Sequence, residues 1–251
     1  MAFRILLADD HPVFRMGVCS LIRSHAGWEV CGEAADGREA VAICRELKPN
    51  LIILDICMPN LNGVDAARLI LKHNPDQKIL VLTNVESEQA IRDCLHAGVR
   101  GWVFKSDRPD ELMAAIVQMQ QNRSSFSSRV SNLILDGYLR PHRAAPIQAL
   151  PPRLSLRERE VVQLVSEGKT SKEVATLLGM TVKTAETHRS NIMIKLKLHS
   201  SVELVMYAIR NEIIHVQLPA MVFQFPKRKW PSGNSSGRQL RKLTWLPLSG
   251  S

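Results

Sequence analysis

Residues 3–121 alternate short apolar runs with amphipathic segments, and this alternation constrains the fold more than any other feature of the chain. The apolar runs are FRILLA, WEVCGEA, LIILD, KILVLT and GWVF, and each is followed by a segment whose apolar residues have helical spacing. Strands that are apolar along their whole length are typical of a parallel sheet covered by helices on both faces. The pattern therefore predicts a doubly wound α/β domain.

The charge of the chain changes along its length. Residues 1–123 carry 14 basic and 16 acidic side chains, whereas residues 216–251 carry 6 basic and no acidic side chains. The net charge of +9 therefore comes from the part of the chain after residue 123. A polyanionic partner is expected for that part and not for the first domain.

Cysteine usage and hydropathy indicate the cellular compartment in which the protein is expected. The five cysteines are odd in number, form no Cys-x-x-Cys pair and all lie in the first hundred residues, which argues against a disulfide framework and against zinc. No signal peptide is apparent, and the apolar stretch 213–226, about fourteen residues long, is too short to span a bilayer. We expect a cytoplasmic protein that does not enter a membrane.

Composition divides the chain into four segments. We predict the α/β domain over residues 1–123, a linker over 124–152, a small all-α domain over 153–216 and a basic, disordered tail over 217–251. The linker is rich in Ser, Arg and Pro, although VSNLILDGYL within it could add a short helix. The basic residues of the tail are interpreted as a solvated segment.

Polar side chains stand at the ends of four apolar runs. Asp9 and Asp10 follow ILLA, Asp55 follows LIIL, Thr83 follows ILVL, and Lys105 follows GWVF. Ligands of an open parallel sheet bind outside the carboxyl ends of its strands. We therefore expect these five side chains to share one cleft.

The expected cleft has the chemistry of phosphoryl transfer. Its three carboxylates would repel one another unless a cation joins them, and Mg²⁺ prefers oxygen ligands and commonly binds phosphate as well. Asp55 would attack a phosphoryl donor to form an acyl phosphate, and Lys105 and Thr83 would each hold a phosphoryl oxygen. The alternative for Asp9 and Asp10 is that they only cap the helix that begins at Pro12.

The motifs LLADDH, LIILDICMP, VLTN and GWVFK resemble those of the receiver domains of two-component response regulators across residues 1–122. The resemblance implies a flavodoxin-like order of five parallel strands and a sensor histidine kinase as phosphodonor. It also implies that Mg²⁺ is bound by Asp9, Asp10, the phosphoacceptor Asp55 and the backbone carbonyl of Cys57.

Trp102 occupies the place where this family usually has a Tyr or Phe that rotates on phosphorylation. We hypothesise that Trp102 still moves inward, because Thr83 would be drawn toward the phosphoryl group and leave space behind it.

Residues 153–216 show three or four short amphipathic helices and no strand pattern. Ser155 and Glu158 predict a capping box at the start of the first helix, Ser171 is expected to cap the second, and Gly179 to end it. A third helix is expected to begin around Thr181. The second and third helices, joined through LGMT, form a helix-turn-helix unit.

The third helix presents hydrogen-bonding side chains suited to the major groove of DNA, although the same residues could form a solvated face. They are Lys183, Thr184, Glu186, Thr187, Arg189, Ser190 and Lys195. The segments LSLREREVVQLVSEG, SKEVA and KTAETHRSNIMIKL resemble the LuxR-type DNA-binding domain. The resemblance implies a recognition helix from Val182 to Leu196 and a homodimer contact through the helix from Ser201 to Asn211.

A receiver joined to this domain defines the NarL/FixJ-like class of response regulators. We therefore expect that phosphorylation of Asp55 by a sensor histidine kinase controls sequence-specific binding to promoter DNA and transcription, with a homodimer as the phosphorylated form. The unphosphorylated receiver would mask or misorient the recognition helix. The chain is expected to be a regulator and not an enzyme, although it accepts a phosphoryl group and could hydrolyse the resulting acyl phosphate.

Two other functions are open to such a chain. One is a phosphorylation-independent DNA-binding regulator with an inert receiver. The other is a phosphatase of the haloacid dehalogenase type, which needs Asp-x-Asp-x-Thr after its first strand, whereas this chain has DDHP there. The complete set of strand-end residues disfavours the first alternative, and the missing motif disfavours the second.

Overall fold

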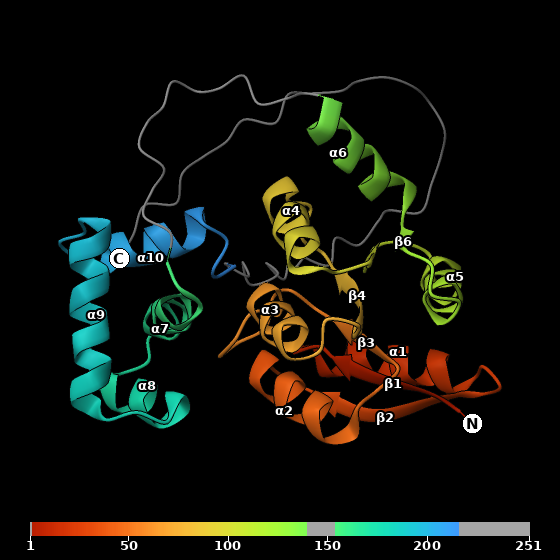
Figure 1. The fold of residues 1–251 in the computed structure, drawn as a ribbon, viewed down its shortest axis with the longest axis horizontal. Helices are drawn as coiled ribbons and strands as arrows, with labels where there is room; N and C mark the ends of the chain where they lie inside the picture. Colours follow the sequence, from red (N-terminus) through yellow and green to blue (C-terminus); the bar gives the residue numbers. More distant parts are fainter. Residues whose placement is uncertain (1, 140–153, 216–251) are drawn as a thin grey trace, which may run out of the picture. The chain divides into compact units, whose positions relative to one another are not determined.

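The computed structural model describes residues 2–139 and 154–215 (Figure 1). The second part of the predicted linker and the whole predicted tail lie outside the described residues. Among the described residues, no helix is long and apolar enough to cross a membrane.

Six parallel strands form the sheet of the first part of the chain, in the order β2-β1-β3-β4-β5-β6. They are β1 (Phe3–Ala8), β2 (Trp28–Ala34), β3 (Leu51–Leu54), β4 (Lys78–Thr83), β5 (Gly101–Phe104) and β6 (Ser125–Phe126). The order of the first five strands is the flavodoxin-like order, so the predicted fold class is confirmed.

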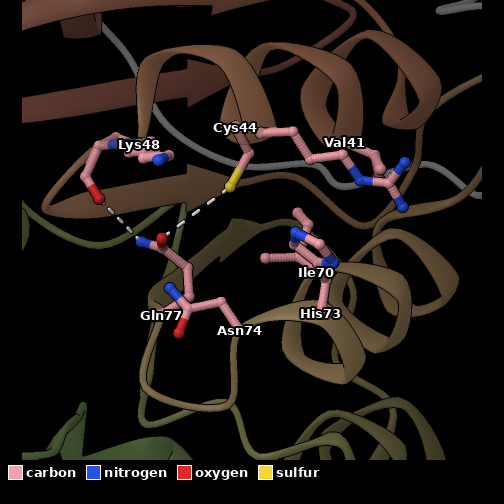
Figure 2. Close-up of a pocket in the computed structure, with 9 residues that line it drawn as sticks. Val41, Cys44, Lys48, Ile70, His73, Asn74 and Gln77 are labelled. Atoms are coloured by element: carbon pink, nitrogen blue, oxygen red, sulfur yellow. Dashed lines mark hydrogen bonds between the residues drawn. The ribbon is translucent and has the colours of Figure 1, made fainter.

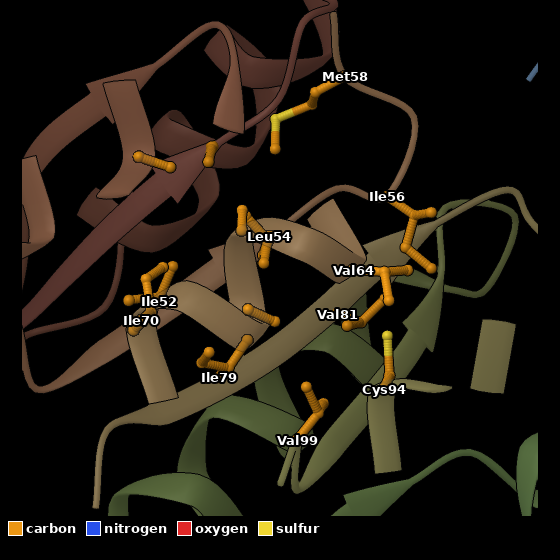
Figure 3. Packing of buried hydrophobic residues seen from close by; sticks show 14 of the residues in the cluster. Ile52, Leu54, Ile56, Met58, Val64, Ile70, Ile79, Val81, Cys94 and Val99 are labelled. Carbon is orange, nitrogen blue, oxygen red and sulfur yellow. The ribbon is translucent and has the colours of Figure 1, made fainter. Parts of the chain in front are cut away.

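Helices cover both faces of this sheet (Figure 1). One face packs against α1 (Pro12–Arg23) and α5 (Pro109–Gln120), and the other against α2 (Gly37–Leu47), α3 (Gly63–His73) and α4 (Glu88–Ala97). Successive side chains of a strand point to opposite faces, so Ile53 lies in the first core while Ile52 and Leu54 lie in the second. Figure 3 shows the packing of this second core.

The first part of the predicted linker extends the α/β domain. β6 pairs with β5, with Trp102 opposite Phe126, and is followed by α6 (Ser128–Leu139), which packs against α4. Val130 of α6 is fully buried in the same core as Trp102. The helix at VSNLILDGYL is therefore present, whereas the sixth strand was not predicted because its two residues are too few to show a periodic pattern.

Residues 154–215 contain four helices: α7 (Leu156–Ser166), α8 (Ser171–Leu178), α9 (Val182–Leu196) and α10 (Ser201–Arg210). The capping box of Ser155 and Glu158 is confirmed. The predicted cap of α8 is wrong by one residue, because Thr170 is the N-cap and forms a capping box with Glu173. The reciprocal bond needs an acidic residue three positions after the cap, and Ser171 has none there.

Candidate functional site

The carboxyl ends of β1, β3, β4 and β5 meet at one edge of the sheet, as the sequence predicted. The backbone N–H of Asp55 donates a hydrogen bond to the carbonyl of Ala8 (2.9 Å), which aligns the ends of β1 and β3. In the same way, the N–H of Lys105 donates to the carbonyl of Thr83 (2.9 Å) at the ends of β4 and β5. The residues that follow these strands are thereby brought together.

The Lys105 ammonium joins two of the carboxylates. Its Nζ lies 2.7 Å from Asp55 Oδ2 and 2.8 Å from Asp9 Oδ2, and its side chain is only 7% exposed. Burial by itself would lower the pKa of Lys105, but the Asp55 and Asp9 carboxylates outweigh burial and hold the pKa above its ordinary value. Lys105 therefore stays charged and fixes both carboxylates.

Asp10 is the carboxylate that lacks such a partner. Its Oδ1 is buried, lies 2.7 Å from His11 Nδ1 and makes no hydrogen bond of good geometry with any described residue. Burial raises the pKa of Asp10, His11 opposes the rise, and the charges of Asp55 and Asp9 add to it. The cluster therefore contains electrostatic repulsion that Lys105 alone does not relieve.

The capping alternative for Asp9 and Asp10 is not supported. The N-cap of α1 is His11, and its side chain makes no capping hydrogen bond. Asp9 instead accepts a hydrogen bond from the N–H of His11 (2.8 Å). Pro12 does occupy the first turn of α1, as predicted.

The acidic cluster fits a hard divalent cation. One ligand atom from each of Asp9, Asp10, His11 and Asp55 lies within 4.8 Å of the others. Carboxylate oxygens predominate in this set, which is the preference of Mg²⁺ and Ca²⁺. A divalent charge would balance the two carboxylate charges that remain after the single ammonium of Lys105 is counted.

The loop after Asp55 is held close to the site by Gly63. Asp55 Oδ1 accepts a hydrogen bond from the N–H of Ile56 (2.7 Å), and the N–H of Gly63 donates to the carbonyl of Ile56 (2.9 Å). A Cβ on Gly63 would lie 2.0 Å from the carbonyl oxygen of Asp55. No described residue donates a hydrogen bond to the carbonyl of Cys57, so that oxygen is available as a ligand.

Thr83 and Trp102 are both buried. Thr83 is 0% exposed, and its Oγ1 accepts a hydrogen bond from the N–H of Val85 (3.3 Å). Trp102 is 1% exposed, and its Nε1 has no hydrogen-bond partner among the described residues. Trp102 lies on the face of β5 that is covered by α4 and α6, and its inward movement on phosphorylation stays a prediction.

Contacts of α6 reach the loop that follows Thr83. The Arg129 guanidinium forms an ion pair with Glu86 in this loop and lies 5.0 Å from the centre of the Phe104 ring. The interaction is half-exposed, so the ion pair is expected to contribute about 0–1 kcal/mol. This contact could not be predicted from local sequence patterns, because 43 residues separate Arg129 from Glu86.

Two further residues, His11 and Phe14, neighbour the acidic cluster and were not predicted from the sequence. His11 follows Asp10 directly and contacts it, and the Phe14 ring centre lies 4.8 Å from Lys105 Nζ. Phe14 lies in the first turn of α1, whereas Lys105 follows β5. Their contact therefore depends on β1 and β5 ending at the same edge of the sheet. A cation over an aromatic face is stabilised by the ring quadrupole.

The predicted DNA-contact residues of α9 fall into two groups. Exposed side chains are those of Lys183, Thr184, Glu186, Thr187 and Ser190. Arg189 donates to Ser201 Oγ (2.8 Å), and Lys195 Nζ lies 2.7 Å from Glu158 Oε2. Burial opposes ionisation of Glu158, but hydrogen bonds from Lys195 and Ser155 hold its pKa below the ordinary value. Lys195 and Arg189 are thus engaged within the helical domain.

Comparison with known proteins identifies both parts of the chain. Residues 5–117 match the response regulator receiver domain, and residues 152–208 match the bacterial regulatory proteins of the luxR family. The chain is 33% identical over 213 residues to the transcriptional regulatory protein LiaR of Bacillus subtilis, with 84% of this chain and 99% of LiaR covered. The chain is a response regulator of the LuxR family.

Other relatives agree with this assignment. The response regulator is 32% identical over 214 residues to the response regulator protein VraR of Staphylococcus aureus strain Mu3, with 85% and 100% of the chains covered. It is 32% identical to a LuxR-family response regulator from Aurantimonas sp. SI85-9A1, with a TM-score of 0.53 and coverage of 55% and 99%. For a solved RcsB–DNA complex the identity is 25%, the TM-score 0.51 and the coverage 82% and 98%.

The predicted family, fold class and function are therefore confirmed. The response regulator joins a receiver domain to a LuxR-type DNA-binding domain and regulates transcription. The domain boundaries and the roles of the individual site residues stay predictions.

Gly63→Ala is expected to lower the free energy of unfolding by about 1–3 kcal/mol, because its Cβ would overlap the backbone of Asp55. Gly17→Ala is the matched control, since a Cβ there meets nothing within 4 Å and lies inside α1. The control should raise the free energy of unfolding by about 0.5–1 kcal/mol. Urea denaturation measures both, and a Gly63→Ala protein as stable as wild type would contradict the close approach.

Proposed function

We propose that Asp55 accepts a phosphoryl group from a sensor histidine kinase and that this acyl phosphate controls promoter binding by the α9 recognition helix. The observation that carries the proposal is the Lys105 ammonium, buried between the Asp55 and Asp9 carboxylates at the edge of the sheet. A charged lysine in that position can neutralise an incoming phosphoryl group without reorganising the site.

Each side chain of the site has a separate role in the proposed phosphoryl transfer. A carboxylate oxygen of Asp55 attacks the phosphorus, the new O–P bond forms, and the P–N bond to the kinase histidine breaks. Lys105 and Thr83 each hold a phosphoryl oxygen. Asp9, Asp10, Asp55 and the carbonyl of Cys57 would hold Mg²⁺, which supplies charge neutralisation when bound.

Hydrolysis of the acyl phosphate within the receiver resets the switch. This reaction returns the regulator to its starting state and does not turn over a separate substrate, so it is a property of the signal and not an enzymatic function. We also propose that the protein acts in the cytoplasm, because the DNA that it binds is there.

Asp55→Asn is expected to abolish labelling by radioactive acetyl phosphate in the presence of Mg²⁺, because an amide is not a nucleophile of this kind. Asp110→Asn is the matched control and should be labelled like wild type, since its side chain is 82% exposed on α5. Chelation of the metal should prevent labelling of both the wild type and the control.

The label should also be released by hydroxylamine, as expected of an acyl phosphate. A wild-type protein that acquires no such label would contradict the proposed phosphoacceptor. Verified labelling that leaves DNA binding unchanged would instead favour the phosphorylation-independent regulator.

We propose that α6 carries the change at Asp55 toward the rest of the chain. β4 ends in Thr83, and the loop after it contains Glu86, which pairs with Arg129 of α6. Movement of Thr83 toward a phosphoryl group would displace this loop and loosen the contact. The buried Trp102, opposite Phe126 of β6, would then change its packing against α6.

Arg129→Gln is expected to speed amide hydrogen exchange in α6, because it removes both the Glu86 ion pair and the contact with Phe104. Arg108→Gln is the control, since Arg108 pairs with Asp110 on the exposed surface of α5. Phosphorylation of wild type should speed exchange in α6 in the same way. If neither Arg129→Gln nor phosphorylation changes the rate of amide exchange in α6, the proposed route through α6 is ruled out.

We propose that the exposed side chains of α9 make the DNA contacts. Lys183 stands in the first turn of α9 and is free to approach a phosphate, while Glu186, Thr187 and Ser190 are placed to reach base edges. Arg189 and Lys195 would have to leave their partners within the domain before binding DNA. A homodimer through α10 is supported by Val202 and Met206, apolar residues four positions apart that are 71% and 45% exposed.

Lys183→Gln is expected to weaken DNA binding at all sequences and to reduce the slope of log affinity against log salt by about 1, because one phosphate contact is lost. Lys72→Gln, an equal charge change on an exposed residue of α3, should leave the slope unchanged. Equilibrium binding at several salt concentrations measures the slope. Equal slopes of log affinity against log salt for Lys183→Gln and wild type would show that Lys183 makes no phosphate contact.

A further inference from the structure

A cavity of about 320 Å³ lies between α2 and α3, at the amino ends of β3 and β4. Its floor is formed by buried residues, and its rim by exposed polar residues. The floor consists of Val41, Cys44, Pro49, Ile70 and Gln77, and the rim of Arg45, Lys48, His73 and Asn74. Small-molecule sites commonly combine an apolar interior of this volume with a few polar groups. The cavity is remote from Asp55, which follows the opposite end of β3.

The rim carries positive charge and no compensating acid. Arg45, Lys48 and His73 line the cavity, whereas no Asp or Glu lines it. Across the two described ranges, none of these three side chains forms an ion pair with a carboxylate. Arg45 and Lys48 at the end of α2 suit the dipole of that helix, but the dipole does not account for the cavity beside them.

Gln77 gives the cavity a buried hydrogen-bond acceptor. Its Nε2 is satisfied by the carbonyls of Pro49 (3.1 Å) and Lys78 (3.3 Å). Among the residues that the structure describes, its Oε1 accepts only from Cys44 Sγ, at 3.9 Å, and a thiol is a weak donor. Figure 2 shows Cys44 of α2 and Gln77 turned toward each other, with His73 of α3 on the facing wall. The amide oxygen therefore has capacity for a stronger donor.

We propose that this cavity binds a small organic anion with an apolar body and a hydrogen-bond donor. Arg45, Lys48 and His73 hold its acidic group, Val41 and Ile70 contact its apolar part, and Gln77 Oε1 accepts from its donor. Such a ligand gives the receiver a chemical input in addition to phosphorylation. It stabilises the receiver by an amount that grows with the logarithm of its concentration above Kd, because it binds the folded state alone.

Indoleacetate is a probe with all three features, namely a carboxylate, an aromatic body and an N–H donor. Indoleacetamide is its uncharged counterpart. In proton–nitrogen correlation spectra of the full chain, indoleacetate is expected to shift the side-chain amide of Gln77 and the backbone amide of Cys44. The affinity for indoleacetamide should be lower by about tenfold or more, since the charged contacts are lost.

Variants of the rim separate charge recognition from nonspecific binding. Arg45→Gln and Lys48→Gln should each weaken indoleacetate binding by about threefold or more, because each removes one cation from an exposed rim. Lys72→Gln, on the exposed side of α3, is the matched control and should bind like wild type. Labelling of Asp55 by acetyl phosphate should be unchanged in all three variants, which keeps this test independent of the phosphoacceptor.

Three results would each overturn the proposal. The first is the absence of shifts at Gln77 and Cys44 with indoleacetate at millimolar concentration. The second is equal binding of indoleacetate and indoleacetamide, or of wild type and the rim variants. The third is a set of shifts confined to the residues around Asp55, which would place the anion in the phosphoacceptor site.

Discussion

Repulsion among three carboxylates at one edge of the sheet is the constraint on which the receiver depends. Asp9 and Asp55 are held by the single ammonium of Lys105, and Asp10, whose pKa is raised, lies against His11 instead. A site in this state favours binding of a cation and of a group that the lysine can neutralise. The proposed phosphorylation of Asp55 draws on this same unbalanced charge.

β5 connects this edge to the rest of the domain. Lys105 follows β5 and reaches past β4 to the carboxylates of β3 and β1, which its long side chain permits. Trp102 and Phe104 lie on the same strand and point to the face covered by α4 and α6. One short strand thus carries the aromatic residues next to α6 and is followed directly by the lysine that pairs with Asp9 and Asp55.

β3 connects the acidic cluster to the cavity between α2 and α3. It has only four residues, all fully buried, between Pro49 in the wall of the α2–α3 cavity and Asp55 at the carboxyl end. A rigid buried strand transmits displacement at one end to the other more readily than an exposed segment would. The α2–α3 cavity and the acidic cluster therefore lie at opposite ends of one buried strand.

The sequence by itself determined the elements and their chemistry. Continuous apolar runs predicted the strands, polar residues after them predicted Asp9, Asp10, Asp55, Thr83 and Lys105 as one site, and capping residues predicted the helices of the DNA-binding domain. These signals are local, since propensity, periodicity and capping involve residues close together in the chain. The Ser171 cap was wrong by one position for a local reason as well, because Thr170 has the acidic partner that Ser171 lacks.

Only the tertiary structure decided which groups contact one another across long separations. It showed Trp102 already buried, Arg129 paired with Glu86, Lys195 paired with Glu158, and Gly63 against the backbone of Asp55. These relations depend on how layers pack and how strands return to an edge, and no periodicity in the sequence encodes such distances. Burial and pairing are properties of the whole packed domain, so they became visible only when the chain was folded.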